Sequence, residues 1–148
     1  MAEGRVLLVE DNADDEALIL RAFRRTALPH DIVVTHDGAE ALEFLFGSTT
    51  GESPSDVELP MVMFLDLKLP KLSGLDVLRR VRAQERTRSL PVVILTSSKE
   101  QEDIERCYEL GANSYVNKPV DFTKFAEAVQ DMGKYWLMLN EPPLPTLR

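Results

Sequence analysis

Four short apolar runs in this 148-residue chain each lead directly into side chains that could take part in chemistry. The densest run, residues 61–65, ends at the carboxylate of Asp66 with no polar residue between. The other three runs lead into Glu10-Asp11, into Thr96 and, after Asn117, into Lys118. Three acids, a hydroxyl and a lysine at four run ends indicate a single site rather than unrelated surface residues.

The three carboxylates predict a bound cation. Two unit charges 4 Å apart repel by about 1 kcal/mol in water and by several times more near a protein surface. Glu10, Asp11 and Asp66 offer oxygen ligands without cysteine or histidine, which disfavours zinc. The pattern favours a hard divalent ion such as Mg²⁺, with Mn²⁺ as a substitute. We expect Asp11 to be the main carboxylate ligand and Glu10 to hold a metal-bound water.

Asp66 is the predicted nucleophile, because carboxylates attack phosphorus to form aspartyl phosphates. The transition state spreads negative charge over three equatorial oxygens, and a metal, an ammonium and a hydroxyl each stabilise such charge. We therefore expect Lys118 to pair with the phosphoryl group and Thr96 to hydrogen-bond it once it is formed. The alternative interpretation assigns these residues to helix caps and surface salt bridges.

The apolar runs alternate with amphipathic stretches along the chain, which predicts five strand–helix units. Strands are expected at 5–9, 31–36, 61–65, 91–95 and 114–117. Helices are expected at 13–27, from a capping box at Asp37 to Phe46, from Ser73, from a capping box at Ser98 to Leu110, and from Asp121. The alternation implies an α/β fold, in which helices cover both faces of a parallel sheet.

The predicted sheet order 2-1-3-4-5 explains how the site assembles. Ligands bind at the carboxyl edge of a parallel sheet, where the strand order reverses. The ends of the first and third strands are neighbours there, so Glu10-Asp11 would lie beside Asp66, with Thr96 and Lys118 flanking them. His36-Asp37 would lie at the sheet edge, away from this cluster.

Composition predicts one acidic domain over residues 1–140, followed by a tail at 141–148. The formal net charge of −8 argues against a nucleic-acid or anionic-membrane surface. No apolar run approaches the ~20 residues that cross a bilayer, and no secretory signal is evident, so we expect a cytoplasmic domain. Residues 47–60 are expected to form an exposed loop.

Four segments together form a recognisable pattern. They are Leu8-Val9-Glu10-Asp11-Asn12, Leu65-Asp66-Leu67-Lys68-Leu69-Pro70 with Gly74 following, Leu95-Thr96-Ser97-Ser98, and Gly111-Ala112 leading into Asn117-Lys118-Pro119. With these segments, residues 5–138 resemble the receiver domain of the response regulators of two-component signalling. The resemblance implies a flavodoxin-like (βα)5 fold and phosphorylation of Asp66 by a histidine kinase.

The resemblance also implies roles for individual residues. It implies that Asp11, Asp66 and the backbone carbonyl of Lys68 bind Mg²⁺. Lys118-Pro119 resembles the family's lysine followed by a cis-proline, which orients the lysine.

Two further residues match the family's switch. Thr96 matches its switch hydroxyl and Tyr115 its switch aromatic. The resemblance then implies a change in the partner affinity of one face, which is formed by the fourth helix, the fifth strand and the fifth helix. Such a domain acts through protein contacts and not as an enzyme.

The long loop before Pro60 and the extended last helix resemble a narrower group, the stand-alone regulators paired with bacterial phytochrome histidine kinases. Residues 135–139 are apolar on more than one face of the last helix, and such surfaces usually need a partner. We therefore predict a homodimer that uses the last helix and the C-terminal tail. The alternative is that Trp136 and Leu139 pack onto their own domain.

Three other functions compete with a phosphoryl acceptor. A degenerate receiver would bind partners without phosphorylation, although all five functional positions are present here. A flavodoxin-like electron carrier would need a hydroxyl- and glycine-rich loop, whereas residues 10–15 are acidic and would repel a flavin phosphate. A phosphatase of the haloacid-dehalogenase type would carry an Asp-x-Asp motif, but here Lys68 stands at the position of the second acid.

Overall fold

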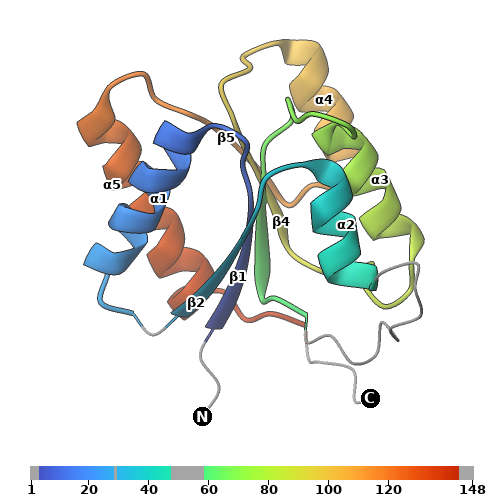
Figure 1. Cartoon of the computed structure of the whole chain (residues 1–148), viewed down its shortest axis with the longest axis horizontal. Helices are drawn as coiled ribbons and strands as arrows, with labels where there is room; N and C mark the ends of the chain where they lie inside the picture. The colour runs from blue at the N-terminus through green and yellow to red at the C-terminus, as the bar shows by residue number, and fades with distance from the viewer. Residues whose placement is uncertain (1–3, 29, 48–58, 144–148) are drawn as a thin grey trace.

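The computed structural model describes residues 4–28, 30–47 and 59–143, and its strands form one parallel sheet (Figure 1). The strands are β1 (Gly4–Val9), β2 (His30–Thr35), β3 (Val62–Leu65), β4 (Val92–Thr96) and β5 (Ser114–Asn117). Their order is β2-β1-β3-β4-β5, and every neighbouring pair is parallel. The flavodoxin-like fold and the strand order predicted from the sequence are confirmed.

Helices cover both faces of the sheet. They are α1 (Ala13–Arg25), α2 (Gly38–Phe46), α3 (Gly74–Ala83), α4 (Gln101–Glu109) and α5 (Phe122–Lys134), which continues as a π-helix at Tyr135–Leu139. α1 and α5 lie on one face, and α2, α3 and α4 on the other (Figure 1). Successive strand side chains point to opposite faces, so Leu7 and Val9 enter one core while Val6 and Leu8 enter the other.

Side-chain caps begin four of these helices, and those at Asp37, Ser73 and Asp121 agree with the helix starts expected from the sequence. The caps are Asn12, Asp37, Ser73 and Asp121, each accepting a hydrogen bond from a backbone N–H three residues later. α4 differs, because it begins only at Gln101 and its N-cap, Glu100, makes no side-chain cap bond. The capping box expected at Ser98 is therefore wrong. The Ser98 hydroxyl donates instead to Asp103 Oδ2 over 2.6 Å.

Some predicted boundaries shift or fall outside the described residues. α1 ends at Arg25 rather than at Ala27, because Ala27 has a left-handed φ of 58° that does not continue a helix. Pro29, most of the predicted loop (48–58) and most of the tail (144–148) lie outside the described part. No helix in the described ranges has the length and apolar character needed to cross a membrane.

Candidate functional site

The register of β1 and β3 brings two of the predicted carboxylates together. Val9 pairs with Leu65 at the carboxyl end of these strands, so Glu10 and Asp66 occupy the next position on each strand. The backbone N–H of Asp66 donates to the carbonyl of Val9 over 3.2 Å, which extends the pairing into the site. The carboxyl edge of the sheet thus carries both acids, as predicted.

The three predicted metal ligands form one cluster. Carboxylate oxygens of Glu10, Asp11 and Asp66 lie within 4.8 Å of one another. Glu10 and Asp66 are buried, whereas Asp11 is exposed. Three oxygen donors this close, open to solvent on one side, fit a hard divalent cation that retains some of its water.

Lys118 neutralises part of this acidic cluster. Its ammonium Nζ lies 2.9 Å from Asp66 Oδ2, 2.8 Å from Glu10 Oε1 and 2.8 Å from Asp15 Oδ2. The lysine follows β5, and its backbone N–H donates to the carbonyl of Thr96 over 2.7 Å. Only 8% of its side-chain surface is exposed, so these charge-assisted bonds form largely away from water.

The surroundings of Glu10 and Lys118 raise the pKa of both groups. Loss of solvent around Glu10 raises the pKa of its carboxyl to about 7, although the hydrogen bond from Lys118 opposes the shift. Burial alone would lower the pKa of the Lys118 ammonium. Hydrogen bonds to Asp15 and Glu10, together with the charge of Asp66, outweigh that effect and hold the Lys118 pKa above its ordinary value. The lysine therefore remains charged.

Thr96 and Tyr115, the predicted switch pair, lie on β4 and β5 next to the same loop. Thr96 is fully buried as the last residue of β4. The Tyr115 hydroxyl donates over 2.9 Å to the carbonyl of Ser98, two residues beyond Thr96. The Asn117 side chain donates to that same carbonyl over 2.9 Å. Two side chains of β5 thus anchor the segment that follows Thr96, while the switch roles stay predictions.

The segment after Asp66 curls back around its carboxylate. The backbone N–H of Lys68 donates to Asp66 Oδ1 over 3.3 Å. The N–H of Gly74 donates to the carbonyl of Leu67 over 2.9 Å, which closes the loop against the start of α3. Lys68 therefore lies beside the acidic cluster, and its carbonyl remains a predicted metal ligand.

The bond between Lys118 and Pro119 is trans, since no peptide bond among the described residues is cis. The predicted cis-proline is therefore wrong for this structure. Trans is the more stable isomer before proline by about 0.5–1 kcal/mol. Lys118 already reaches Asp66 with this isomer, so its orientation does not require the cis form.

Asp15 is a member of the site that the sequence reasoning missed. It belongs to an acidic triplet, Asp14, Asp15 and Glu16, in the first turn of α1, a pattern explained equally well by the helix dipole. The four-residue spacing from Asp11 places Asp15 one helical turn further along the chain. That spacing offered a clue, but only the fold brings Asp15 to Lys118.

His36 and Asp37 lie away from the cluster, as predicted. Asp37 caps α2 and forms a surface ion pair of 3.3 Å with Lys71. His36 contacts Glu16 and Glu40 on the surface.

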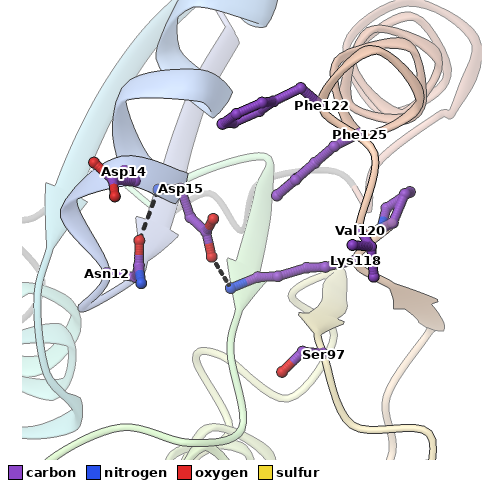
Figure 2. A pocket seen from close by; sticks show the side chains of 9 residues that line it. Asn12, Asp14, Asp15, Ser97, Lys118, Val120, Phe122 and Phe125 are labelled. Atoms are coloured by element: carbon purple, nitrogen blue, oxygen red, sulfur yellow. Dashed lines mark hydrogen bonds and ion pairs between the residues drawn. The ribbon is translucent and has the colours of Figure 1, made fainter.

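A pocket opens beside the acidic cluster, between the first turns of α1 and α5 (Figure 2). The ion pair of Asp15 and Lys118 forms part of its wall, as do the exposed side chains of Val120 and Phe122. Its volume of about 340 Å³ leaves room beside Lys118 for a donor group.

Comparison with known proteins identifies relatives that span almost the whole chain. The FilR2 protein of Methanothrix harundinacea (strain 6Ac), described as a probable methanogenesis regulatory protein, is 39% identical over 95% of this chain and 88% of its own. The phosphorylated cyanobacterial phytochrome response regulator RcpA superposes with a TM-score of 0.87 at 31% identity, covering 96% of this chain and 99% of its own.

Two further solved structures of response regulators are similar. The bacteriophytochrome response regulator RtBRR is 46% identical over 98% of this chain and 87% of its own, with a TM-score of 0.72. The Mn²⁺-bound response regulator Rcp1 is 29% identical over 95% of this chain and 99% of its own, with a TM-score of 0.86. The model of the response regulator receiver domain family matches residues 6–130. With this match and the cluster at the sheet edge, the chain belongs to the response-regulator receiver family.

Proposed function

We propose that this chain is a stand-alone response regulator that accepts a phosphoryl group on Asp66 from a histidine kinase. The observation that carries the proposal is the position of Asp66. Its carboxylate belongs to a three-acid cluster and also lies 2.9 Å from a buried ammonium. A carboxylate with a cation site on one side and a lysine on the other is arranged for phosphoryl transfer. Residues 1–140 would form the receiver and residues 141–148 its tail.

In the proposed reaction, a carboxylate oxygen of Asp66 attacks the phosphorus of a phosphohistidine. The new O–P bond forms as the P–N bond breaks, and the imidazole nitrogen keeps the electron pair of that bond. Lys118 contacts the phosphoryl oxygens, and Thr96 moves to hydrogen-bond them. Mg²⁺, held by Glu10 through water, Asp11, Asp66 and the Lys68 carbonyl, would neutralise the charge on these oxygens. The Mn²⁺ ion in the structure of Rcp1 supports a divalent ion of this kind.

The partner kinase is proposed to be a bacterial phytochrome. RcpA and RtBRR are both described as phytochrome response regulators, and both match nearly the full length of this chain. The match extends past residue 130, where the family model ends. We infer that the chain acts through regulated protein contacts in the cytoplasm, and not as an enzyme, a nucleic-acid binder or a membrane protein.

The signal is proposed to leave through the face formed by α4, β5 and α5. Tyr115 and Asn117 on β5 both bond the carbonyl of Ser98, in the segment that joins Thr96 to α4. Movement of Thr96 toward a phosphoryl group would pull on this segment and on its β5 anchors. The affinity of that face for partners would change in consequence.

We also propose a homodimer through the end of the last helix. Met138 and Leu139 are 57% and 65% exposed, and Tyr135 is 46% exposed. Trp136 and Leu137 instead pack against the core beneath α5. The alternative of packing onto the chain's own domain therefore holds for Trp136, while Leu139 is left for a partner to cover.

The decisive experiment uses a small phosphodonor in place of the kinase. Wild-type protein, Asp66→Asn and a control, Asp31→Asn, are incubated with Mg²⁺ and acetyl phosphate and weighed by intact-protein mass spectrometry. Asp31 is a surface acid paired with Arg5, so its variant tests for non-specific labelling. We expect one phosphoryl group on the wild type and the control, none on Asp66→Asn, and none after chelation of the metal. If the wild type gains no phosphoryl group through Asp66, a phosphorylation-independent receiver is the better description.

A further inference from the structure

Three carboxylates contact the Lys118 ammonium in this structure. A lysine ammonium has three donors and no acceptor, and three carboxylates, those of Glu10, Asp15 and Asp66, lie within 2.9 Å of it. Glu10 and Asp66 belong to the metal cluster, whereas Asp15 does not. Asp15 is therefore a lysine partner that stands outside the predicted metal set.

The backbone of α1 holds Asp15 in this position. The side chain of Asn12 accepts a hydrogen bond of 2.9 Å from the Asp15 N–H (Figure 2). The backbone N–H of Asn12 in turn donates to Glu10 Oε2 over 3.1 Å. Asp14, the next acid along the chain, lines the same pocket but makes no hydrogen bond or ion pair with Lys118 in the described residues. Contact with the ammonium is thus specific to one of two adjacent acids.

Transfer to Asp66 needs a contact between the phosphoryl group and the Lys118 ammonium, which three carboxylates already surround. Before the O–P bond forms, Glu10 and Asp66 both contact the Lys118 ammonium. The phosphoryl oxygens of an incoming donor must therefore displace one of the three contacts. The Glu10 side chain is 1% exposed and that of Asp66 10% exposed, but that of Asp15 is 27% exposed and lies in the pocket wall. Of the three contacts, the one between Lys118 and Asp15 is therefore the most exposed to solvent and the easiest to displace.

We propose that Asp15 is a positioning residue that restrains Lys118 and must release it before phosphoryl transfer, so that this ion pair slows phosphorylation of Asp66. The inference rests on the proposed function. It assigns Asp15 no contact with the reacting atoms, because its effect passes through the lysine. Removal of the Asp15 charge leaves Lys118 two carboxylate partners and a weaker third contact for the donor to displace.

The test compares initial phosphorylation rates of Asp66 with acetyl phosphate and saturating Mg²⁺, followed by intact-protein mass spectrometry. Asp15→Asn removes the ion pair, Asp15→Glu retains it, and Asp14→Asn removes the same charge from the neighbouring acid. We expect Asp15→Asn to react about two- to fivefold faster than wild type, the scale of one partly exposed ion pair. Asp15→Glu should stay near the wild-type rate. The phosphorylation rate of Asp14→Asn should increase by less than about half as much as that of Asp15→Asn.

The outcomes separate this inference from the proposed function. If wild type is not phosphorylated on Asp66, the proposed function fails. If wild type is phosphorylated and Asp15→Asn is equally fast or slower, the restraint does not exist. If Asp14→Asn accelerates as much as Asp15→Asn, the effect is general electrostatic repulsion and the inference is overturned. Circular dichroism confirms folding of each variant, and Asp15→Ala replaces Asp15→Asn if the latter does not fold.

Discussion

The ammonium of Lys118 donates to Asp66 Oδ2 over 2.9 Å, although 52 residues separate the two in the chain. The contact joins the loop after β5 to the end of β3 across the end of β4, and little of either side chain is exposed. A buried charge is costly unless it is paired. This ion pair therefore links the stability of the domain to the chemistry of its site.

Replacing the lysine should destabilise the protein in a way that metal reverses. In Lys118→Met, three carboxylates lose their cation, and breaking a buried pair costs about 3–5 kcal/mol. We expect a loss of that order in the free energy of unfolding without metal, measured by urea denaturation. Mg²⁺ should stabilise the variant more than the wild type, since the ion then provides the missing positive charge.

Lys71→Met is the matched control for that measurement. Lys71 pairs with Asp37 at 3.3 Å, but its side chain is 69% exposed, and surface pairs contribute about 0–1 kcal/mol. A cost as small for Lys118→Met as for Lys71→Met would contradict the assigned role of the buried pair.

Metal affinity should fall as the pH is lowered through 7. Burial raises the pKa of Glu10 to about 7, so the carboxyl is protonated below that pH. A cation can then interact with the full negative charge of Glu10 only after this proton has left. Each pH unit below 7 should weaken binding by at most about tenfold. Calorimetric titration with Mg²⁺ at pH 8, 7 and 6 measures the trend.

Glu10→Gln is the variant that assigns this pH dependence. It should bind Mg²⁺ more weakly at pH 8 and show a flatter profile between pH 8 and 6. Asp14→Asn removes a nearby charge outside the metal cluster and should keep the wild-type profile. An affinity that stays constant from pH 8 to 6 in the wild type would show that Glu10 does not titrate in this range.

Adding a methyl group at Gly74 should disturb the loop that carries Asp66. A Cβ atom built on Gly74 would overlap the Asp66 carbonyl oxygen and lie 2.7 Å from Leu67 Cα. Backbone atoms have no rotamers through which to yield, so the loop itself must shift. We expect Gly74→Ala to lose about 1–3 kcal/mol of stability and to be phosphorylated more slowly on Asp66.

Gly133→Ala provides the comparison for Gly74→Ala. A Cβ there would lie 3.1 Å from a ring carbon of Phe23, in the core on the α1–α5 side of the sheet. Its phosphorylation rate should match that of the wild type. Equal rates in Gly74→Ala and wild type, measured by mass spectrometry, would mean that the loop tolerates the added atom without moving Asp66.

The proposed dimer should dissociate when a charge is placed at its centre. Leu139→Lys puts an ammonium at a side chain that is 65% exposed in the monomer, so the monomer itself should lose little stability. We expect sedimentation velocity to show a concentration-dependent dimer for the wild type and a monomer for Leu139→Lys. Val120→Lys, at a 97% exposed site beside the pocket, should remain dimeric. A wild type that stays monomeric at all concentrations would defeat the proposal.

Local pattern was sufficient to predict most of the fold. The central strands β1, β3 and β4 are short apolar runs because they are buried on both faces of the sheet. All five predicted strands agree with the structure to within about one residue. The caps at Asp37, Ser73 and Asp121 depend only on residues within one helical turn. α4 is the exception, because Asp103 engages the hydroxyl of Ser98 and the helix begins beyond it.

The sequence by itself determined which strand-end residues meet at the site, since parallel strands end on the same edge of the sheet and the residues at those ends must lie there. Only the tertiary structure decided how those residues pair. Asp15 and Lys118 are 103 residues apart, and their contact depends on how α1 and β5 are placed over the sheet. The isomer before Pro119 and the packing of Trp136, but not of Leu139, against the core were decided in the same way. Local patterns specify strand ends and caps, but three-way charge contacts and the packing of a helix end depend on distances between elements remote in the chain.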